Sequence, residues 1–294
     1  TARATLALRT HTERGRLEYL LVGLVRGEDG AFRAYPMGKG SGSVTTWSRA
    51  DGFVRLERNL EIVEAGSDVE VTLLGPGLAP ADLVVIGSHC TGLDLIARAL
   101  HAEGFTVKLL AVGSLGGIEA ARRGECDVAP AHLLDPQTDR YNTPFLDPTL
   151  TLVRGYLRMQ GVVTRDDERR ATEALVADPR LRMVNRNRGS GTRVLIDGLL
   201  GSRRPDGYAY EPRSHHAVAA AVAQGRADWG VTIETVARES GLRFRPLRSE
   251  HYDFVVPVSR LERPAVRALI RLLEPGSALR AELEAAGFAS PEAG

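Results

Sequence analysis

The stretch "GPGLAPADLVVIGSHCTGLDLIARALHAEG", residues 75–104, contains the change of pattern that decides the fold. Its first eight residues include two prolines and two glycines, which interrupt regular structure, so we expect a domain boundary there. The following "DLVVIGS" predicts a buried strand. The helix expected next ends at Gly104 and repeats its apolar residues on one face, at Leu93, Ile96, Ala97 and Leu100.

Upstream of this stretch, residues 1–75 consist of short runs that are typical of β-strands. Runs such as "EYLLVGLVR" (18–26) and "DVEVTLL" (68–74) are separated by turn signals such as "GEDG" (27–30). No helical period of useful length occurs between them. We therefore expect a small all-β domain, a barrel or a sandwich, over residues 1–77.

Downstream, strand patterns alternate with helical patterns up to the end of the chain. Such alternation favours a mostly parallel sheet with helices on both faces. Two long β segments, near 150–163 and 250–258, suggest that the chain crosses twice between two lobes. The sequence thus predicts an α/β two-lobed domain over 78–294, preceded by the small all-β domain. The expected limits are about 80–155 with 252–294 for lobe 1 and about 156–251 for lobe 2.

Composition excludes several classes of protein. The 294 residues are 43% hydrophobic and 26% charged, and their formal net charge of +1 provides no bulk positive field for a nucleic acid. The apolar runs are too short to span a membrane. The two cysteines show no metal-ligand spacing, and together with the absence of a signal-peptide pattern they favour a cytoplasmic location. The missing initial Met suggests a fragment or a processed chain.

Ligands of open α/β sheets bind at the carboxyl ends of the strands, where helix N-termini expose unpaired N–H groups and a partial positive charge. Four strand-to-helix turns place hydroxyl groups near small residues at such ends. We therefore predict an oxyanion site in the cleft between the lobes, although Ser and Thr that merely cap helices would give the same pattern. The turns are "GSHCTG" (87–92), "VGSLGG" (112–117), "NRNRGSGT" (185–192) and "PRSHH" (212–216).

The third turn, within "NRNRGSGTRVLIDGLL" (185–200), gives the clearest signal. It lacks the spacing and the Gly-Lys-Ser/Thr ending of a nucleotide-binding P-loop, whereas guanidinium groups suit a small tetrahedral oxyanion. The helix that follows should have four residues on its inner side, namely Val194, Leu195, Gly198 and Leu199. No catalytic residue and no metal ligand is expected. The predicted ligand-binding residues are Ser88, Thr91, Ser114, His132, Arg186, Arg188, Ser190, Gly191, Thr192 and Ser214.

Two resemblances to known families cover nearly the whole chain. Residues 2–74 resemble the C-terminal β-domain of molybdopterin molybdenumtransferase, chiefly through "YPMGKGSGSVTTWSRADGFVRLERNLEIVEAGSDVEVTLL" (35–74). Residues 80–260 resemble the periplasmic-binding-protein-like domain that is attached to molybdenum-cofactor and regulatory proteins, and two turns resemble those of tungstate-binding uptake components. The motifs in this second part are "AHLLDPQTDRYN" (131–142), "VNRNRGSGTRVLID" (184–197), "HHAVAAAVAQGRADWG" (215–230) and "YDFVVP" (252–257).

The resemblances imply a protein of molybdenum cofactor biosynthesis that binds molybdate or tungstate and supports metal insertion into molybdopterin. The transferase's catalytic domain has no counterpart here, so we expect a non-catalytic part that acts with that domain, in a longer chain or in trans. The β-domain could serve as a homodimer surface, and neither nucleic acid nor membrane is an expected partner. Two alternatives stay open: a ligand sensor that regulates a neighbouring domain, and a site for molybdopterin or its adenylylated intermediate.

Overall fold

The computed structural model describes residues 1–38, 47, 49–75, 80–165, 170–188, 190–212 and 214–291. The expected domain boundary at 75–82, the transferase-like stretch at 35–74 and the third and fourth turns each include residues outside these ranges. The chain forms two compact units. Unit 1 comprises Thr1–Ala131, Leu146–Val153 and Phe254–Leu272, and unit 2 comprises His132–Phe145, Arg154–Asp253 and Leu273–Gly294. The predicted lobe limits stay a prediction, and these units group residues 132–145 and 273–294 differently from them.

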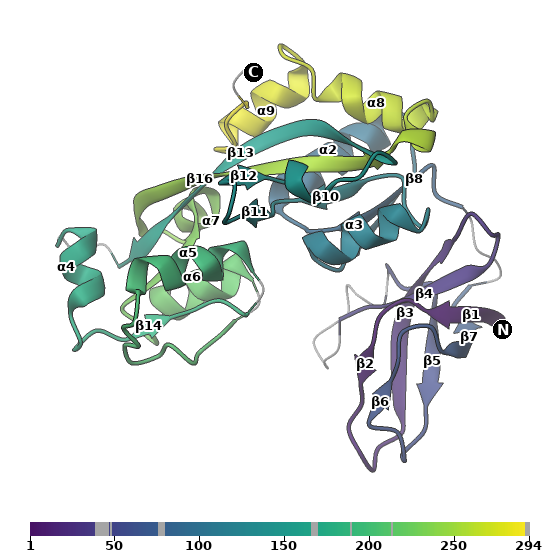
Figure 1. The fold of residues 1–294 in the computed structure, drawn as a ribbon, viewed down its shortest axis with the longest axis horizontal. Coiled ribbons are helices and arrows are strands. Elements are labelled where there is room, and N and C mark those ends of the chain that lie inside the picture. Colours follow the sequence, from purple (N-terminus) through teal and green to yellow (C-terminus); the bar gives the residue numbers. More distant parts are fainter. Residues whose placement is uncertain are drawn as a thin grey trace. The chain divides into compact units, whose positions relative to one another are not determined.

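Unit 1 begins with five strands that close into a β-barrel, drawn in purple and blue in Figure 1. They are β1 (Ala2–Leu6), β3 (Glu18–Arg26), β4 (Phe32–Pro36), β5 (Gly52–Leu56) and β7 (Asp68–Leu73), accompanied by the short pair β2 (Thr10–His11) and β6 (Ile62–Val63). Alternate residues of β3, namely Leu20, Val22 and Leu24, fill the barrel core, as the two-residue period of a strand requires. The predicted small all-β domain is confirmed as a barrel.

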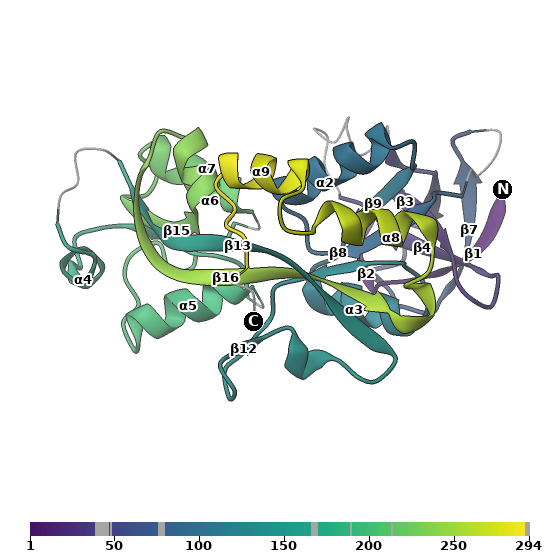
Figure 2. The same ribbon diagram turned by 90° about the horizontal axis from the view of Figure 1, so that it is seen from above.

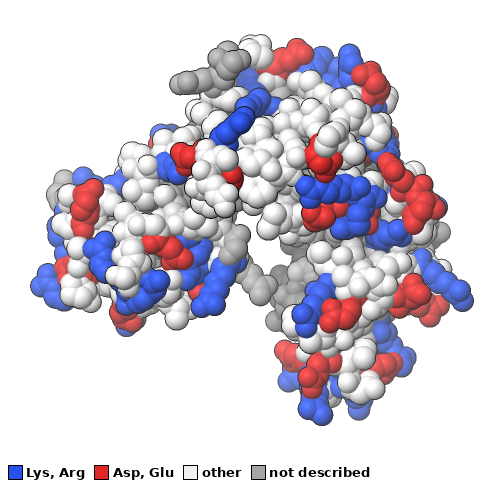
Figure 3. All heavy atoms as spheres, viewed as in Figure 1, with Lys and Arg blue, Asp and Glu red and all other residues white. Residues whose placement is uncertain are grey.

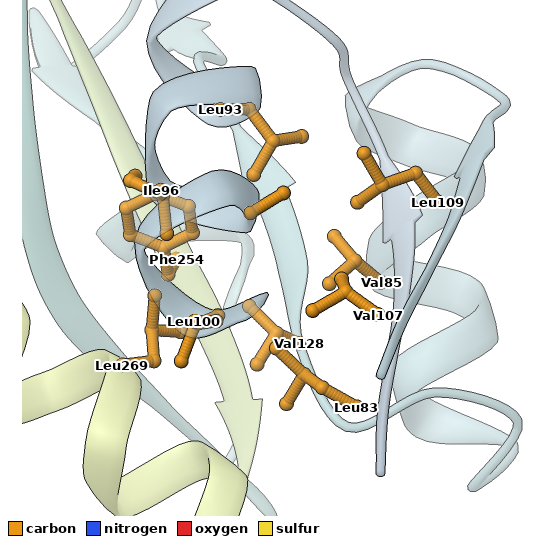
Figure 4. A pocket seen from close by; sticks show the side chains of 11 residues that line it. Leu83, Val85, Leu93, Ile96, Leu100, Val107, Leu109, Val128, Phe254 and Leu269 are labelled. Atoms are coloured by element: carbon orange, nitrogen blue, oxygen red, sulfur yellow. The ribbon is translucent and has the colours of Figure 1, made fainter. Parts of the chain in front are cut away.

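The rest of unit 1 has α/β character. Its elements are β8 (Leu83–Gly87), α2 (Thr91–Ala102), β9 (Val107–Ala111), α3 (Ser114–Arg122), β10 (Ala129–Ala131), η2 (Val258–Arg260) and α8 (Pro264–Leu272). The strand and helix predicted in 82–104 are confirmed, and β8 pairs in parallel with β9. Figure 4 shows the aliphatic side chains and Phe254 between α2 and these strands. The space that they leave is about 10 Å³, so this is hydrophobic core and not a ligand site.

Buried polar contacts join the barrel to the α/β part of unit 1. The Tyr35 hydroxyl donates a hydrogen bond to the Glu125 carboxylate, which also accepts from Arg123 Nε at 2.9 Å. Tyr35 and Glu125 are 0% and 3% exposed, and burial together with the carboxylate raises the pKa of Tyr35 far above its ordinary value. Lys108 forms an ion pair with Asp51 at a second point. These polar contacts, in addition to the chain connection, therefore hold the barrel against the α/β part of unit 1.

Unit 2 is built around a sheet with helices on both of its faces. The five-stranded sheet has the order β10-β16-β13-β15-β14. Unit 2 contains β14 (Met183–Val184), β15 (Trp229–Ile233) and most of β13 (Leu150–Thr164) and β16 (Arg243–Pro257), whereas β10 and residues 150–153 and 254–257 of the two long strands belong to unit 1. The long β segment expected near 250–258 proves to be part of the longer strand β16. The other elements are β11 (Leu134–Asp135), β12 (Arg140–Tyr141), η1 (Thr143–Phe145), α4 (Thr172–Ala177), α5 (Gly191–Leu200), α6 (His215–Ala223), α7 (Glu234–Glu239) and α9 (Ala278–Ala285).

Alternate residues of these strands pack on opposite sides of the sheet. Trp229 and Val231 join a cluster with residues of α5, whereas Val163 and Val184 join one with residues of α6 and α7. Figure 2 shows α5 on one side of β13, β15 and β16 and α6 and α7 on the other. The prediction of helices on both faces of the sheet is thus confirmed for unit 2.

The predicted inward face of α5 is partly wrong, since only Leu195 and Leu199 of its four residues are half-buried and pack against the core. The side chains that α5 buries are Thr192, Arg193, Ile196 and Leu200, while Val194 is 54% exposed and Gly198 is exposed. Hydrophobic periodicity missed this orientation because Arg193 is inside, where it pairs with Asp197 at 2.9 Å and with Glu211 at 2.7 Å. The side of α5 that was predicted to be inner instead lines a surface cavity.

Candidate functional site

Two neighbouring strands of unit 2 carry buried polar side chains on one face. Arg158 and Gln160 are two residues apart on β13, and Glu250 and Tyr252 are two residues apart on β16. Each of the four is at most 2% exposed. A sheet face that a helix covers is ordinarily apolar, because burying polar groups costs free energy unless they are paired. The buried polar side chains on this face therefore indicate a candidate ligand site.

Glu250 is held between Arg158 and His132. Arg158 Nε donates to Glu250 Oε2 at 2.9 Å, and His132 Nδ1 lies 2.7 Å from Glu250 Oε1. Arg158 and His132 also contact the Tyr252 ring, which stacks on His132 and lies 4.9 Å from the Arg158 guanidinium. Burial alone would raise the pKa of Glu250, but Arg158 and His132 together bring it well below its ordinary range. Glu250 is therefore a carboxylate at neutral pH.

Arg186, in the turn before α5, forms a second, partly buried contact with His215, the first residue of α6. Arg186 is 7% exposed, and its Nη1 lies 3.1 Å from His215 Nδ1. A guanidinium only donates, so His215 Nδ1 accepts and the ring proton is on Nε2. Burial and the two arginines, Arg186 and Arg158, keep the pKa of His215 well below 6.5. Burial and Arg158 lower the pKa of Arg186 to about 10, an environment that favours a nearby negative charge.

The pKa of His215 predicts how stability depends on pH. The folded protein resists protonation of His215, whereas the unfolded chain takes up the proton at its ordinary pKa of 6.5. This contribution to stability is therefore present above pH 6.5 and decreases by up to about 1.4 kcal/mol for each pH unit below it. We expect the melting temperature to fall from pH 7 to pH 5.5 and to fall less in the His215→Gln variant. Equal slopes for the two proteins in calorimetry would contradict the assignment.

The third turn begins α5 as predicted. Ser190 is the N-cap, with its Oγ accepting from Arg193 N at 3.2 Å and donating to Asn187 O at 2.9 Å. Its hydroxyl is thus used as a cap, which was the simpler interpretation of this turn. A Cβ at Gly191 would lie 3.6 Å from Glu250 Oε1, and Thr192 is 1% exposed. The structure brings this turn and His132 together around Glu250.

Arg188 and Ser214 lie in more exposed surroundings. The Arg188 side chain is 86% exposed, and its Nε is 3.9 Å from a Glu211 carboxylate oxygen. Ser214 is exposed and caps α6 by accepting from Ala217 N at 3.1 Å. Their predicted roles in binding stay predictions, and the contacts give more support to Arg186 than to Arg188.

The first and second turns lie together in unit 1. Backbone N–H groups of Val112 and Gly113 donate to Gly87 O at 2.9 and 3.1 Å, so the turns after β8 and β9 are adjacent. Ser88 lies in the first turn, Thr91 is the first residue of α2, and Ser114, which is 7% exposed, is the first residue of α3. The predicted site residues thus fall into two groups, one in each unit, and the interlobe cleft stays a prediction.

Sequence reasoning missed Arg158, Gln160, His215 and Glu250. A signal was present, because long β segments with a polar residue at every second position place those residues on one face. In "YLRMQG" this rule selects Arg158 and Gln160, whereas "RSEHYD" is polar in both alternating sets and does not single out Glu250. His215 was noticed only as part of a histidine pair, since nothing in the sequence shows that it meets Arg186.

Other kinds of site find no support in the described part of the chain. Those residues contain no group of three or more His, Cys, Asp and Glu side chains that could hold a metal ion. None of the helices in the described ranges combines the length and the apolar character of a membrane-spanning segment. On the face shown in Figure 3, acidic and basic side chains are interspersed, in keeping with the net charge of +1.

Family models match both parts of the chain. The PBP superfamily domain matches residues 97–274, and the MoeA C-terminal region (domain IV) matches residues 3–74. Together the two matches support a ligand-binding role related to molybdenum cofactor biosynthesis.

Two curated relatives share sequence with the chain. The uncharacterised protein YvgK of Bacillus subtilis (strain 168) is 35% identical over 186 residues, which are 59% of this chain and 60% of that protein. An uncharacterised protein encoded in the 5′ region of the ferredoxin 2Fe-2S gene of Clostridium pasteurianum is 32% identical over 83 residues, 28% of this chain and 73% of that protein. The chain thus spans less than two thirds of YvgK.

Solved structures share the fold of the second part. An ABC-type phosphate transport receptor from Vibrio cholerae has a TM-score of 0.53 and 14% identity, covering 71% of this chain and all of that one. The ancestral amino acid-binding protein AncCDT-1 has a TM-score of 0.50 and 14% identity, covering 69% and 94%. At such low identity these likenesses show the fold alone. With a family model that spans more than half of its residues, the chain belongs to the PBP superfamily and carries a MoeA-type C-terminal β-domain in front of that domain.

Proposed function

We propose that the protein binds a small oxyanion, molybdate or tungstate, beside Arg186 and supports metal insertion into molybdopterin. The observation that carries this proposal is the buried Arg186, in the turn before α5, with its guanidinium against the first residue of α6, His215. A helix N-terminus attracts an anion through its unpaired N–H groups and its dipole. The Nε2–H of His215 would add a further donor.

The charge balance of the buried cluster supports an anionic ligand. Arg158 and Glu250 are an ion pair, and the Glu250 carboxylate also attracts Arg186. Arg186 adds a second buried guanidinium, and His215 is neutral at pH 7 because its pKa is well below 6.5. A dianion near Arg186 would supply negative charge where burial disfavours the positive one. The MoeA-type domain provides the context for molybdenum, and the catalytic domain would act from a longer chain or in trans.

Selectivity among oxyanions depends on the Glu250 carboxylate. A site of donors alone would favour a fully deprotonated ion over monohydrogen phosphate, whose proton needs an acceptor. Glu250 is such an acceptor near Gly191, so the structure weakens that argument against phosphate. Sulfate and phosphate therefore belong in the same test as molybdate and tungstate.

Thermal unfolding with each ion tests the proposal. A ligand that binds only the folded state adds about 2.7 kcal/mol of stability at one hundred times its Kd, which corresponds to a rise of about 5 °C or more in the melting temperature. We expect this rise with molybdate or tungstate and a smaller one with sulfate and phosphate. If no oxyanion raises the melting temperature at millimolar concentration while a pterin does, the oxyanion assignment is wrong.

Molybdopterin is the second candidate ligand. A pterin would need an accessible aromatic ring for stacking, but Tyr252 is fully buried against Tyr156 and His132, and Tyr208 is engaged by Arg193 and Asp197. Tyr141 is the candidate that faces a cavity of unit 2. This placement favours a test of pterins at that cavity, separately from the anion site.

A further inference from the structure

A cavity of about 310 Å³ lies beside α5 within unit 2. Its size is at the lower end of the range for small-molecule sites, about 300–1,000 Å³. Its walls are mainly aliphatic side chains from α5, β11 and β16, including Leu134, Leu195 and Leu247. Gln160 and Glu250, from the neighbouring strands β13 and β16, also line it. The cavity thus combines apolar walls with a few polar groups, as ligand sites do.

The two buried polar side chains present hydrogen-bond acceptors. Gln160 is 2% exposed, and its Oε1 receives no hydrogen bond from any residue that the structure describes. Glu250 Oε1 lies 2.7 Å from His132 Nδ1, and a carboxylate oxygen can accept a second hydrogen bond. A buried acceptor without a donor costs free energy, so this end of the cavity favours a ligand that supplies donors.

The cationic residue in the lining does not reverse this preference. Arg248 already donates to Asp139 Oδ1 at 2.6 Å. An anion entering the cavity would meet the Glu250 carboxylate and the Gln160 carbonyl oxygen, both of which carry negative charge density. The cavity and the Arg186 region therefore differ in the sign of charge that they favour.

We propose that this cavity binds a small ring compound that presents N–H donors along one edge, such as the adjacent N–H and NH₂ groups of an amidine or a 2-aminopyrimidine ring. The apolar walls would contact the ring, and the donor edge would face Gln160 and Glu250. The proposal rests on the cavity alone and does not depend on the oxyanion assignment.

Gly198 of α5 offers a way to fill the cavity without disturbing the fold. A Cβ at this position would meet no atom within 4 Å, and Gly198 lines the cavity. Replacing a helical glycine also removes its unfavourable helix propensity. The Gly198→Leu variant should therefore fold at least as well as the wild-type protein while occupying the space of the ligand. Ala281→Leu, at an exposed position of α9 in the same unit, is the matched control.

Titration calorimetry with four probes tests the proposal. Benzamidine, guanosine and pterin carry the donor edge, and benzoate has the ring but presents only acceptors. We expect at least one donor probe to bind and benzoate not to bind. Gln160→Met, which removes the acceptor but keeps the length of the side chain, should weaken the bound probe about tenfold. Gly198→Leu should abolish binding, and Ala281→Leu should leave it unchanged.

Several results would overturn this assignment. They are the absence of binding by all three donor probes at millimolar concentration, binding of benzoate as tight as that of benzamidine, and an unchanged affinity in both Gln160→Met and Gly198→Leu. An Arg186→Ala variant separates the two proposals, because it should keep the affinity for the donor probe and lose affinity for the oxyanion. Loss of both affinities in a folded Arg186→Ala protein would mean that there is no separate cavity site.

Discussion

Replacing Arg158 by methionine is expected to reduce the free energy of unfolding by about 3–5 kcal/mol, because it leaves the Glu250 carboxylate buried without its main cation. Arg158 and Glu250 are 2% and 1% exposed, and two guanidinium nitrogens of Arg158 contact the same carboxylate oxygen. His132 would remain as a partner of the other oxygen. Urea unfolding of the wild-type and variant proteins measures the difference.

A double variant distinguishes the cost of an unpaired charge from the loss of packing. Arg158→Met combined with Glu250→Leu removes both charges and leaves apolar groups of similar size. Such replacement of a buried pair is often close to neutral, so the double variant should recover most of the lost stability. A double variant that is as unstable as Arg158→Met alone would show that the guanidinium matters through packing on Tyr252 and not through its charge.

The class of fold followed from the sequence because it depends on local patterns. Short strand-like runs between turn signals predicted an all-β domain, a barrel or a sandwich, and the apolar face of Leu93, Ile96 and Leu100 predicted α2. Closure of the barrel by the parallel pair β1 and β4 could not be predicted, since no local pattern determines which strands meet. The residues that make up each unit could not be predicted either, because they depend on pairings between distant parts of the chain, such as that of Leu157 with Ala289.

The candidate site was predicted less completely, and the reason lies in the long strands. Hydroxyl-rich turns are visible in a sequence, and α5 does begin at Gly191 after its Ser190 cap. Glu250, which lies beside the first residue of that helix, comes from β16, and its partner Arg158 comes from β13; only tertiary pairing brings these strands together. Glu250 in particular changes the chemistry expected of this turn. Its carboxylate is a hydrogen-bond acceptor beside a turn that was expected to offer only donors to an oxyanion. The face of α5 was predicted incorrectly in part for a similar reason, because Arg193 is buried through its ion pairs with Asp197 and Glu211.

The second large effect is expected for Arg186. Removing a charged hydrogen-bond donor from a ligand site costs about 1.5–3 kcal/mol, so Arg186→Ala should weaken oxyanion binding by roughly ten- to more than a hundredfold. Thr192→Ala deletes a hydroxyl and should cost about 0.5–1.5 kcal/mol. Arg188→Ala is the matched control, because this arginine is two residues away and its side chain is 86% exposed. We expect it to change affinity by much less than Arg186→Ala.

Calorimetric titration of molybdate or tungstate into these three variants separates a ligand site from a well-capped helix. Arg186 is buried, so each variant is first compared with the wild-type protein in thermal unfolding without ligand. A folded Arg186→Ala protein that loses affinity, beside an Arg188→Ala protein that keeps it, would place the anion at the buried guanidinium. Unchanged affinity in both Arg186→Ala and Thr192→Ala would mean that the turn only begins α5 and that the anion binds elsewhere. Equal losses in Arg186→Ala and Arg188→Ala would indicate attraction by general positive charge, since an exposed arginine and a buried one share only their charge.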